Sequence, residues 1–187
     1  MSRIDQLAQA LQARPPVLAD PTGRARAAVA IVLAPHPDAI LLIRRAERAG
    51  DRWSGQMAFP GGRWAAEDPD LLTTAKRETS EEVGLDLTRA RVLGQFDDSA
   101  PRSPSLPPVV VTPYLFAVDR AEPLNPNLEV AAAGWVPLDE LLRGEVYRPF
   151  EYRAEGTRYL FPGYHLNLGV VWGMTERILT PVLSLLR

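Results

Sequence analysis

The chain of 187 residues contains no cysteine, which excludes disulfides, thiolate metal sites and a cysteine nucleophile. Its two histidines, His36 and His165, lie far apart and do not form a metal-binding spacing. A formal net charge of −2 argues against a general nucleic-acid surface, because such a surface needs a basic excess. No apolar run reaches membrane-spanning length, and the first residues lack the apolar core of a signal peptide. These absences favour a cytoplasmic protein that binds neither nucleic acid nor membranes.

The composition is that of an ordinary folded domain. Hydrophobic residues make up 46% of the chain and charged residues 24%, and the length suffices for a sizeable core. The 18 prolines concentrate in connections, notably in segment 101–108, and no repeat or linker divides the chain. We therefore expect one domain over residues 1–187. Whether segment 101–108 closes over a site as a lid is open.

The hydrophobic pattern mixes several strands with few helices. This mixture indicates an α+β protein, built as an α/β/α sandwich around a mixed sheet. Besides a helix between Asp68 and Gly84, helices are expected over residues 4–13, from residue 139, and over residues 170–186 with a bend or interruption near Pro181. Strands are expected over residues 27–34, 40–44, 91–96, 109–118, 131–136, 147–153 and 158–161, the last two forming a hairpin with Gly156 near its turn.

The most informative segment is residues 77–84, which contains three carboxylates in close succession. Residues three and four positions apart share one face of a helix, so Glu78, Glu81 and Glu82 should project together. Their mutual repulsion is costly unless a positive charge lies over them. A hard divalent cation such as Mg²⁺ or Mn²⁺ is the natural occupant of a site with oxygen ligands.

Signals at both ends support this helix. Asp68 is expected as the N-cap with Pro69 in the first turn, and Gly84 as the residue of positive φ after the last turn. A mostly apolar stripe at helical spacing can pack on a core; it consists of Leu72, Ala75, Thr79 and Val83. The acids occupy the adjoining face, so they begin at the edge of the buried side.

These residues resemble the Nudix box, G-x5-E-x7-R-E-U-x-E-E-x-G-U, in which U is apolar. The matching residues are Arg77, Glu78, Glu81, Glu82, Gly84 and Leu85. An acid follows six residues after each of two glycines, Asp68 after Gly62 and Glu67 after Gly61, but the gap to Arg77 is longer than seven residues in both cases. Thr79 also departs from the pattern, because the family prefers an apolar residue there.

More of the chain resembles one branch of that family, the coenzyme A pyrophosphatases. The branch pattern before the box is matched at both ends, in residues 41–46 and 55–62. Its middle is one residue longer here and places Gly50 at the central arginine, for which Arg48 or Arg52 is a substitute. Further similar stretches are residues 128–130, 135–138 and 171–179.

The resemblance implies the Nudix fold and a divalent cation, Mg²⁺ or Mn²⁺. Carried over by position, Glu78 and Glu82 are direct metal ligands, and Glu81 is a third ligand or holds a water molecule beside the metal. The Gly61 carbonyl is expected to add a further oxygen ligand, because glycine lets the backbone approach closely. Arg77 is expected to pair with a box acid and orient it.

The remaining candidate residues lie outside the acidic helix. Glu129 is the first candidate for the general base, and Asp97 or Asp98 the second. The residues expected to bind the phosphates of a small nucleotide substrate are Arg44, Arg45, Arg52, Gly61 and Gly62.

The resemblance implies hydrolysis of a nucleoside diphosphate linked to another group. In the coenzyme A branch the products are 3′,5′-ADP and 4′-phosphopantetheine, and some arginines before the box are candidates to bind the 3′-phosphate. Three alternatives stay open: a Nudix hydrolase of ADP-ribose, dinucleotides or nucleoside triphosphates; a Nudix-fold binding module without catalysis; and a globular domain with a chance acidic helix. Assembly as a homodimer is also open.

Overall fold

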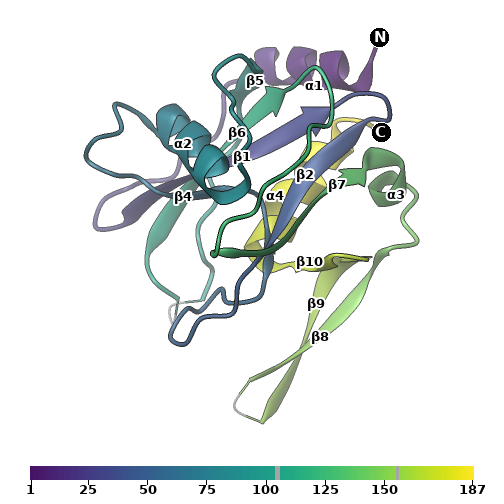
Figure 1. Ribbon diagram of the computed structural model, residues 1–187. Coiled ribbons are helices and arrows are strands. Elements are labelled where there is room, and N and C mark those ends of the chain that lie inside the picture. Colours follow the sequence, from purple (N-terminus) through teal and green to yellow (C-terminus); the bar gives the residue numbers. More distant parts are fainter. Residues whose placement is uncertain (104–105, 155) are drawn as a thin grey trace.

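The computed structural model describes residues 1–103, 106–154 and 156–187 (Figure 1). Within these ranges a seven-stranded mixed sheet forms the centre, in the order β3-β2-β1-β6-β5, with β4 beside β1 and β7 beside β2. Only β1 and β6 pair in parallel; the other described neighbours are antiparallel. The strands are β1 (Ala25–Ala34), β2 (Ala39–Arg45), β3 (Met57–Ala58), β4 (Gly61–Arg63), β5 (Arg91–Gln95), β6 (Val109–Ala117) and β7 (Val130–Pro137).

Helices cover both faces of this sheet (Figure 1). On one face, Ala30 and Val32 of β1 belong to the same hydrophobic cluster as helix α2 (Leu71–Val83). On the other face, their neighbours Ile31 and Leu33 share a cluster with α1 (Arg3–Gln12) and α4 (Gly173–Ser184). Because successive strand residues face opposite sides, β1 is apolar throughout. The fold is thus the expected α/β/α sandwich with a mixed sheet.

A second, three-stranded sheet projects from the main body (Figure 1). It consists of β8 (Tyr147–Ala154), β9 (Thr157–Leu166) and β10 (Gly169–Trp172), so the expected hairpin is confirmed. The prediction that residues 170–172 begin the last helix is wrong. These residues pair with Gly163–His165 in β9, and Gly173, with φ 67°, turns the chain from the strand into α4. The helix runs past Pro181 to Ser184, so of the expected bend or interruption the interruption does not occur.

The start of α2 also differs from the prediction. Asp70, not Asp68, is the N-cap, and its side chain accepts a hydrogen bond from the backbone N–H of Thr73 at 2.7 Å. Asp68 is instead buried against the helix. The other end agrees with the sequence signal, because Gly84 has φ 71° and caps the helix with a bond to the Ser80 carbonyl.

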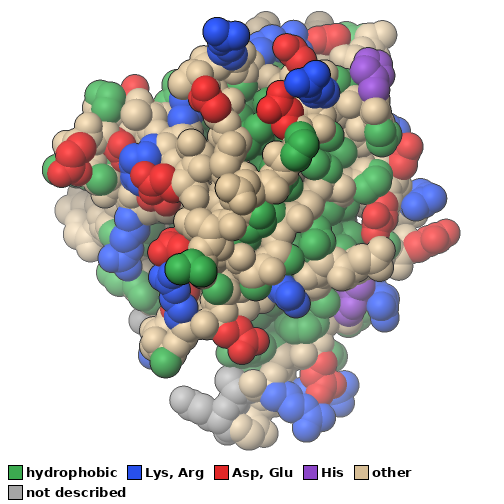
Figure 2. Space-filling model, viewed as in Figure 1, with side chains coloured by type: hydrophobic (Ala, Val, Ile, Leu, Met, Phe, Trp, Pro, Cys, Tyr) green, Lys and Arg blue, Asp and Glu red, His purple; other side chains and the backbone are tan. Residues whose placement is uncertain are grey.

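The remaining short helix, α3 (Leu138–Leu142), begins one residue before its expected start at residue 139. Residues 104 and 105 of the segment 101–108 lie outside the described ranges, and so does the question of whether the segment is a lid. Over the described ranges, no helix is both long and apolar enough to cross a membrane. On the face that Figure 2 shows, acidic and basic side chains are interspersed and form no continuous basic field.

Candidate active site

Strand β4 brings two glycines directly against the acidic face of α2. Gly61 and Gly62 pair with Val29 and Ala28 of β1. A Cβ atom at Gly61 would overlap the β1 backbone, and one at Gly62 would overlap the carboxylate of Glu78. The Gly61 N–H donates to Glu82 Oε2 at 2.9 Å. Glycine is therefore required at Gly61 by the β1 backbone, and at Gly62 it leaves room for the Glu78 carboxylate in its present position.

The three helix acids differ in exposure. Glu82 is buried, the Glu78 side chain is 16% exposed and the Glu81 side chain is 55% exposed. Burial raises the pKa of Glu82 to about 7; the Gly61 N–H and the charge of Arg45 oppose this rise, whereas the Glu78 charge adds to it. Burial also raises the pKa of Glu78, and the Arg77 guanidinium opposes that rise. The site therefore contains negative charge that the protein compensates only in part.

Arg77 holds two of these acids together with Asp68. Its Nη1 lies 2.9 Å from Glu78 Oε1 and 3.1 Å from Glu81 Oε2. On its other side, Nε and Nη2 donate to the Asp68 carboxylate at 3.0 and 2.9 Å. This pairing, with a further bond from the Thr74 hydroxyl, lowers the pKa of Asp68 to about 2. The expected pairing of Arg77 with box acids is present, and Asp68 anchors the arginine.

The donor set suits a hard divalent cation. Carboxylate oxygens, such as those of Glu78, Glu81 and Glu82, are ligands that Mg²⁺ and Mn²⁺ prefer. In the described ranges no three His, Cys, Asp or Glu side chains already stand in a metal-holding arrangement. Arg77 and the Gly61 N–H instead hold the acids. A cation would favour the charged forms of Glu78 and Glu82, whose pKa values are raised mainly by burial.

Arg45 contributes positive charge close enough to Glu82 to affect its pKa. Its charge lowers the pKa of Glu82, and its Nη2 lies 2.8 Å from Asp51 Oδ2. The Nε atom of Arg45 is buried and has no hydrogen-bond partner among the described residues. A buried donor without a partner is costly, so this atom is available to an anionic ligand.

Glu129 also belongs to this site. Its charge raises the pKa values of both Glu78 and Glu82, and its carboxylate forms an ion pair with Arg48 at 3.0 Å. Asp97 and Asp98 are engaged elsewhere: Asp97 pairs with Arg14, and Asp98 accepts a hydrogen bond from the Thr112 hydroxyl. Of the candidate bases, the structure thus places Glu129 with the acids.

The other two candidate arginines, Arg44 and Arg52, are exposed. Arg44 is exposed and neighbours Arg45 in β2, so it faces the opposite side of the sheet, where its stem lies near Gly169. Arg52 is exposed in the connection between β2 and β3. The structure therefore separates Arg44 from Arg45, while Arg52 adjoins Asp51, the ion-pair partner of Arg45.

The fold and this loop–helix site together define a class of hydrolase that acts on pyrophosphate linkages with divalent cations. A family model for the NUDIX domain matches residues 23–155. A Yersinia pestis (strain Pestoides F) protein, named uncharacterized Nudix hydrolase NudL, is 34% identical over 158 residues, which cover 83% of this chain and 76% of that protein. The chain belongs to the Nudix family, and it is a Nudix hydrolase acting on a nucleoside diphosphate derivative.

Two further similarities extend this result. The Schizosaccharomyces pombe protein C14C4.10c is 39% identical over 115 residues, which cover 57% of this chain but only 34% of that protein. The chain thus spans about a third of that relative. The crystal structure of a MutT/nudix family protein from Enterococcus faecalis superposes with a TM-score of 0.55 at 19% identity, covering 95% of this chain and 66% of that one. This likeness concerns the fold.

Proposed function

We propose that this Nudix hydrolase cleaves the internal pyrophosphate of coenzyme A or a close derivative, producing 3′,5′-ADP and 4′-phosphopantetheine. The observation that carries this proposal is that the segments resembling the coenzyme A branch contact one another in the fold. The Arg45 N–H donates to the Gln56 carbonyl at 3.0 Å, which joins residues 41–46 to residues 55–62. The Ala46 N–H donates to the Glu129 carbonyl at 2.8 Å, which adds residues 128–130.

The C-terminal stretch that resembles the branch joins the same assembly. The Thr175 hydroxyl of α4 donates to the Met57 carbonyl of β3 at 3.0 Å. Hydrogen bonds therefore link these segments, which are distant in sequence, in the region that precedes β4. This linkage supports treating residues 1–187 as one functional domain. A cytoplasmic location and a homodimer remain predictions.

In the proposed site, Glu78, Glu81, Glu82 and the Gly61 carbonyl hold Mg²⁺ or Mn²⁺. A bound divalent cation neutralises the charge of the pyrophosphate and polarises its phosphoryl oxygens. Arg77 positions Glu78 and Glu81 through its anchor on Asp68. The mutual orientation of the acids is thereby set before substrate binds, which favours catalysis by positioning.

Arg45 and Glu129 have the two remaining proposed roles. Arg45 donates from its free Nε to a phosphate oxygen, while Asp51 holds the other end of the guanidinium. Glu129 accepts a proton from the attacking water as general base, and Arg48 orients its carboxylate. Arg44 and Arg52 are proposed to contact more distant parts of the substrate, since both side chains are exposed.

One rival is a different Nudix substrate: ADP-ribose, a dinucleotide or a nucleoside triphosphate. It is favoured by the extra residue between Ala46 and Gly55 and by Gly50 at the position of the central arginine. The second rival is a Nudix-fold binding module without catalysis. All three helix acids are present, and this argues against such a module.

Product analysis separates these possibilities. The purified protein is incubated with Mg²⁺ or Mn²⁺ and either coenzyme A, ADP-ribose, a diadenosine polyphosphate or a nucleoside triphosphate, with Glu82→Gln as control. Release of 3′,5′-ADP from coenzyme A by the wild type only is the expected result. Preferred cleavage of another compound would discard the substrate but keep the chemistry. Cation binding without any cleavage would favour the binding module.

A further inference from the structure

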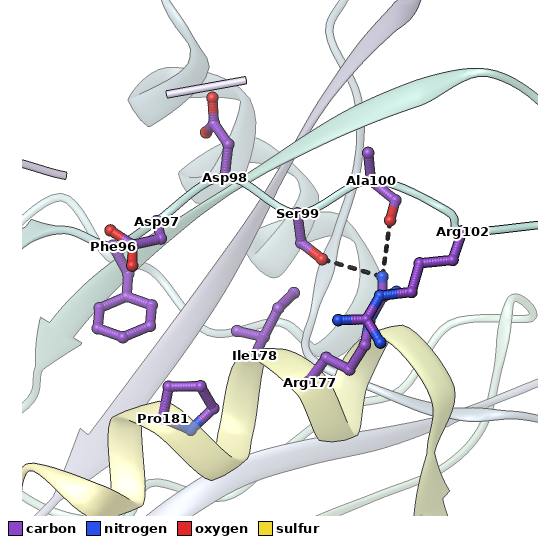
Figure 3. A pocket seen from close by; sticks show the side chains of 9 residues that line it. All are labelled: Phe96, Asp97, Asp98, Ser99, Ala100, Arg102, Arg177, Ile178 and Pro181. Atoms are coloured by element: carbon purple, nitrogen blue, oxygen red, sulfur yellow. Dashed lines mark hydrogen bonds between the residues drawn. The ribbon is translucent and has the colours of Figure 1, made fainter. Parts of the chain in front are cut away.

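A cavity of about 280 Å³ lies between the segment that follows β5 and helix α4 (Figure 3). Residues 96–100 and Arg102 form one wall, and Arg177, Ile178 and Pro181 of α4 form the other. None of these residues has a role in the proposed acidic site. Arg177 belongs to the stretch 171–179 that resembles the coenzyme A branch, but the resemblance assigns no role to it.

Two arginines line this cavity, Arg102 from the segment after β5 and Arg177 from α4. The half-buried Arg177 donates from Nη2 to the Ala100 carbonyl at 2.7 Å and to the Ser99 hydroxyl at 3.3 Å. Within the described ranges its guanidinium makes no further hydrogen bond, so its other N–H groups are available to a ligand. Arg102 is exposed, and no ion pair is recorded for it among the described residues. Burial and the nearby charge of Arg102 both lower the pKa of Arg177, so the cavity concentrates like charge.

The two acids in the lining do not neutralise these arginines. Asp97 Oδ1 lies 2.8 Å from Arg14 Nη1 and accepts the Val17 N–H. Asp98 accepts hydrogen bonds from the Ala19 N–H at 3.0 Å and the Thr112 hydroxyl at 2.7 Å. Figure 3 shows both carboxylates on the far side of the cavity from the guanidinium groups. The positive charge is therefore open to an anion from solution.

We propose that this cavity binds a phosphomonoester group between Arg102 and Arg177. A planar guanidinium donates two parallel hydrogen bonds to a phosphate, and two guanidinium groups match the charge of a phosphate dianion. The hydrogen bonds to Ser99 and Ala100 fix the Arg177 side chain before the anion arrives. Preorganisation of this kind lowers the entropic cost of binding.

The phosphate can have two sources. A row of paired residues crosses the sheet from the acidic site to the cavity. Arg63, beside Gly62, pairs with Ala27 of β1; Ala27 pairs with Val111 of β6, and Val111 pairs with Ser99. Three strand spacings of about 4.8 Å place Ser99 roughly 14 Å from Arg63, within reach of an extended nucleotide. One source is thus a second phosphate of the substrate, such as the 3′-phosphate of coenzyme A, and this version rests on the proposed function. The other source is free phosphate. The acids lie on α2 and the cavity borders α4, and these helices cover opposite faces of the sheet, so a cavity ligand separate from the substrate also fits.

Binding of inorganic phosphate to the full-length protein, in the presence of a chelator and at constant ionic strength, tests the cavity independently of catalysis. Isothermal titration calorimetry should give saturable binding that weakens about tenfold or more in Arg102→Ala, because one of two charge-assisted contacts is lost. Arg89→Ala is the matched control: Arg89 is also exposed but lies before β5, at the other end of that strand. Arg177→Lys keeps the charge but removes the planar fork, and should also weaken binding.

Kinetics with coenzyme A and 3′-dephospho-coenzyme A then identify the source. If the substrate phosphate occupies the cavity, the ratio of the two kcat/KM values falls about tenfold in Arg102→Ala and stays constant in Arg89→Ala. A constant ratio combined with weakened phosphate binding assigns the cavity to free phosphate. If coenzyme A is not cleaved at all, the proposed function fails while calorimetry still tests the cavity. Phosphate binding that is absent, or equal in Arg102→Ala and wild type, overturns the proposal.

Discussion

One carboxylate is buried near each end of helix α2, and the pKa values of the two carboxylates shift in opposite directions. Near the start of the helix, Asp68 accepts hydrogen bonds from Arg77 and Thr74, which lower its pKa to about 2. Near the end, Glu82 receives one backbone hydrogen bond, and burial raises its pKa to about 7. Hydrogen bonds to the charged form of a buried acid favour that form, whereas burial without such compensation disfavours it, and a strongly raised pKa is typical of candidate functional sites.

The largest effect on activity is expected from the uncompensated acid. Glu82→Gln removes a proposed metal ligand, so kcat/KM should fall by about a thousandfold or more, in line with losses on removing an essential catalytic group. Steady-state hydrolysis measures this change, and circular dichroism should show an intact fold. Near-normal turnover in a folded Glu82→Gln protein would contradict the metal-site assignment.

The compensated acid should matter more for stability. Asp68→Ala leaves Arg77 without its buried partner, so the free energy of unfolding should fall by about 3 kcal/mol. Denaturant unfolding at neutral pH provides the measurement. The exposed Glu67→Ala, one residue away, is the control and should change stability little. If Asp68→Ala and Glu67→Ala lowered the free energy of unfolding equally, Asp68 would not act as an anchor for Arg77.

The two acids should also give opposite pH dependence. The folded-state pKa of Asp68 lies below the ordinary value of 3.8, so its contribution is complete above pH 4 and is lost as the pH falls through about 2. For Glu82, the folded-state pKa lies above the ordinary value of 4.5. The contribution of Glu82 to the free energy of unfolding is therefore complete below pH 4.5 and is lost as the pH rises through about 7.

Glu82→Gln tests this inversion directly in the absence of divalent cations. At pH 8 the variant should be more stable than wild type by on the order of 2 kcal/mol, because it no longer buries a charge. At pH 5 the difference should be much smaller. Thermal unfolding with a chelator at both pH values measures it. A variant that is less stable than wild type at pH 8 would show that Glu82 is compensated after all.

The smallest of these effects concerns substrate binding. Arg45→Ala should raise KM by about tenfold with a smaller change in kcat, as expected when uniform binding is lost. Arg44→Ala should raise KM less, because Arg44 faces the other side of β2 from Arg45. Steady-state kinetics with the best substrate of the panel measures both. Equal KM values for wild type and Arg45→Ala would exclude Arg45 from phosphate binding.

The sequence signals that succeeded are local ones. The helical spacing of α2, its glycine cap at Gly84 and the alternating or apolar strand patterns depend on neighbouring residues, so they are readable from the chain alone. Two of the predictions that failed concern segments whose local patterns are ambiguous. The apolar run at residues 170–172 suits a strand as well as a helix, and only pairing with β9 decides between them. Asp68 and Asp70 are both acceptable caps, and only the position of Arg77 separates them.

The sequence by itself determined the family, the layered architecture and the acidic face of α2, because each follows from residue types at fixed spacings. Tertiary structure decided how each charge is compensated. Asp68 meets Arg77 while Glu82 remains largely unpaired, and Arg102 comes to lie beside Arg177 from a distant part of the chain. Burial and charge pairing depend on which segments the sheet brings together, and no spacing along the chain records that.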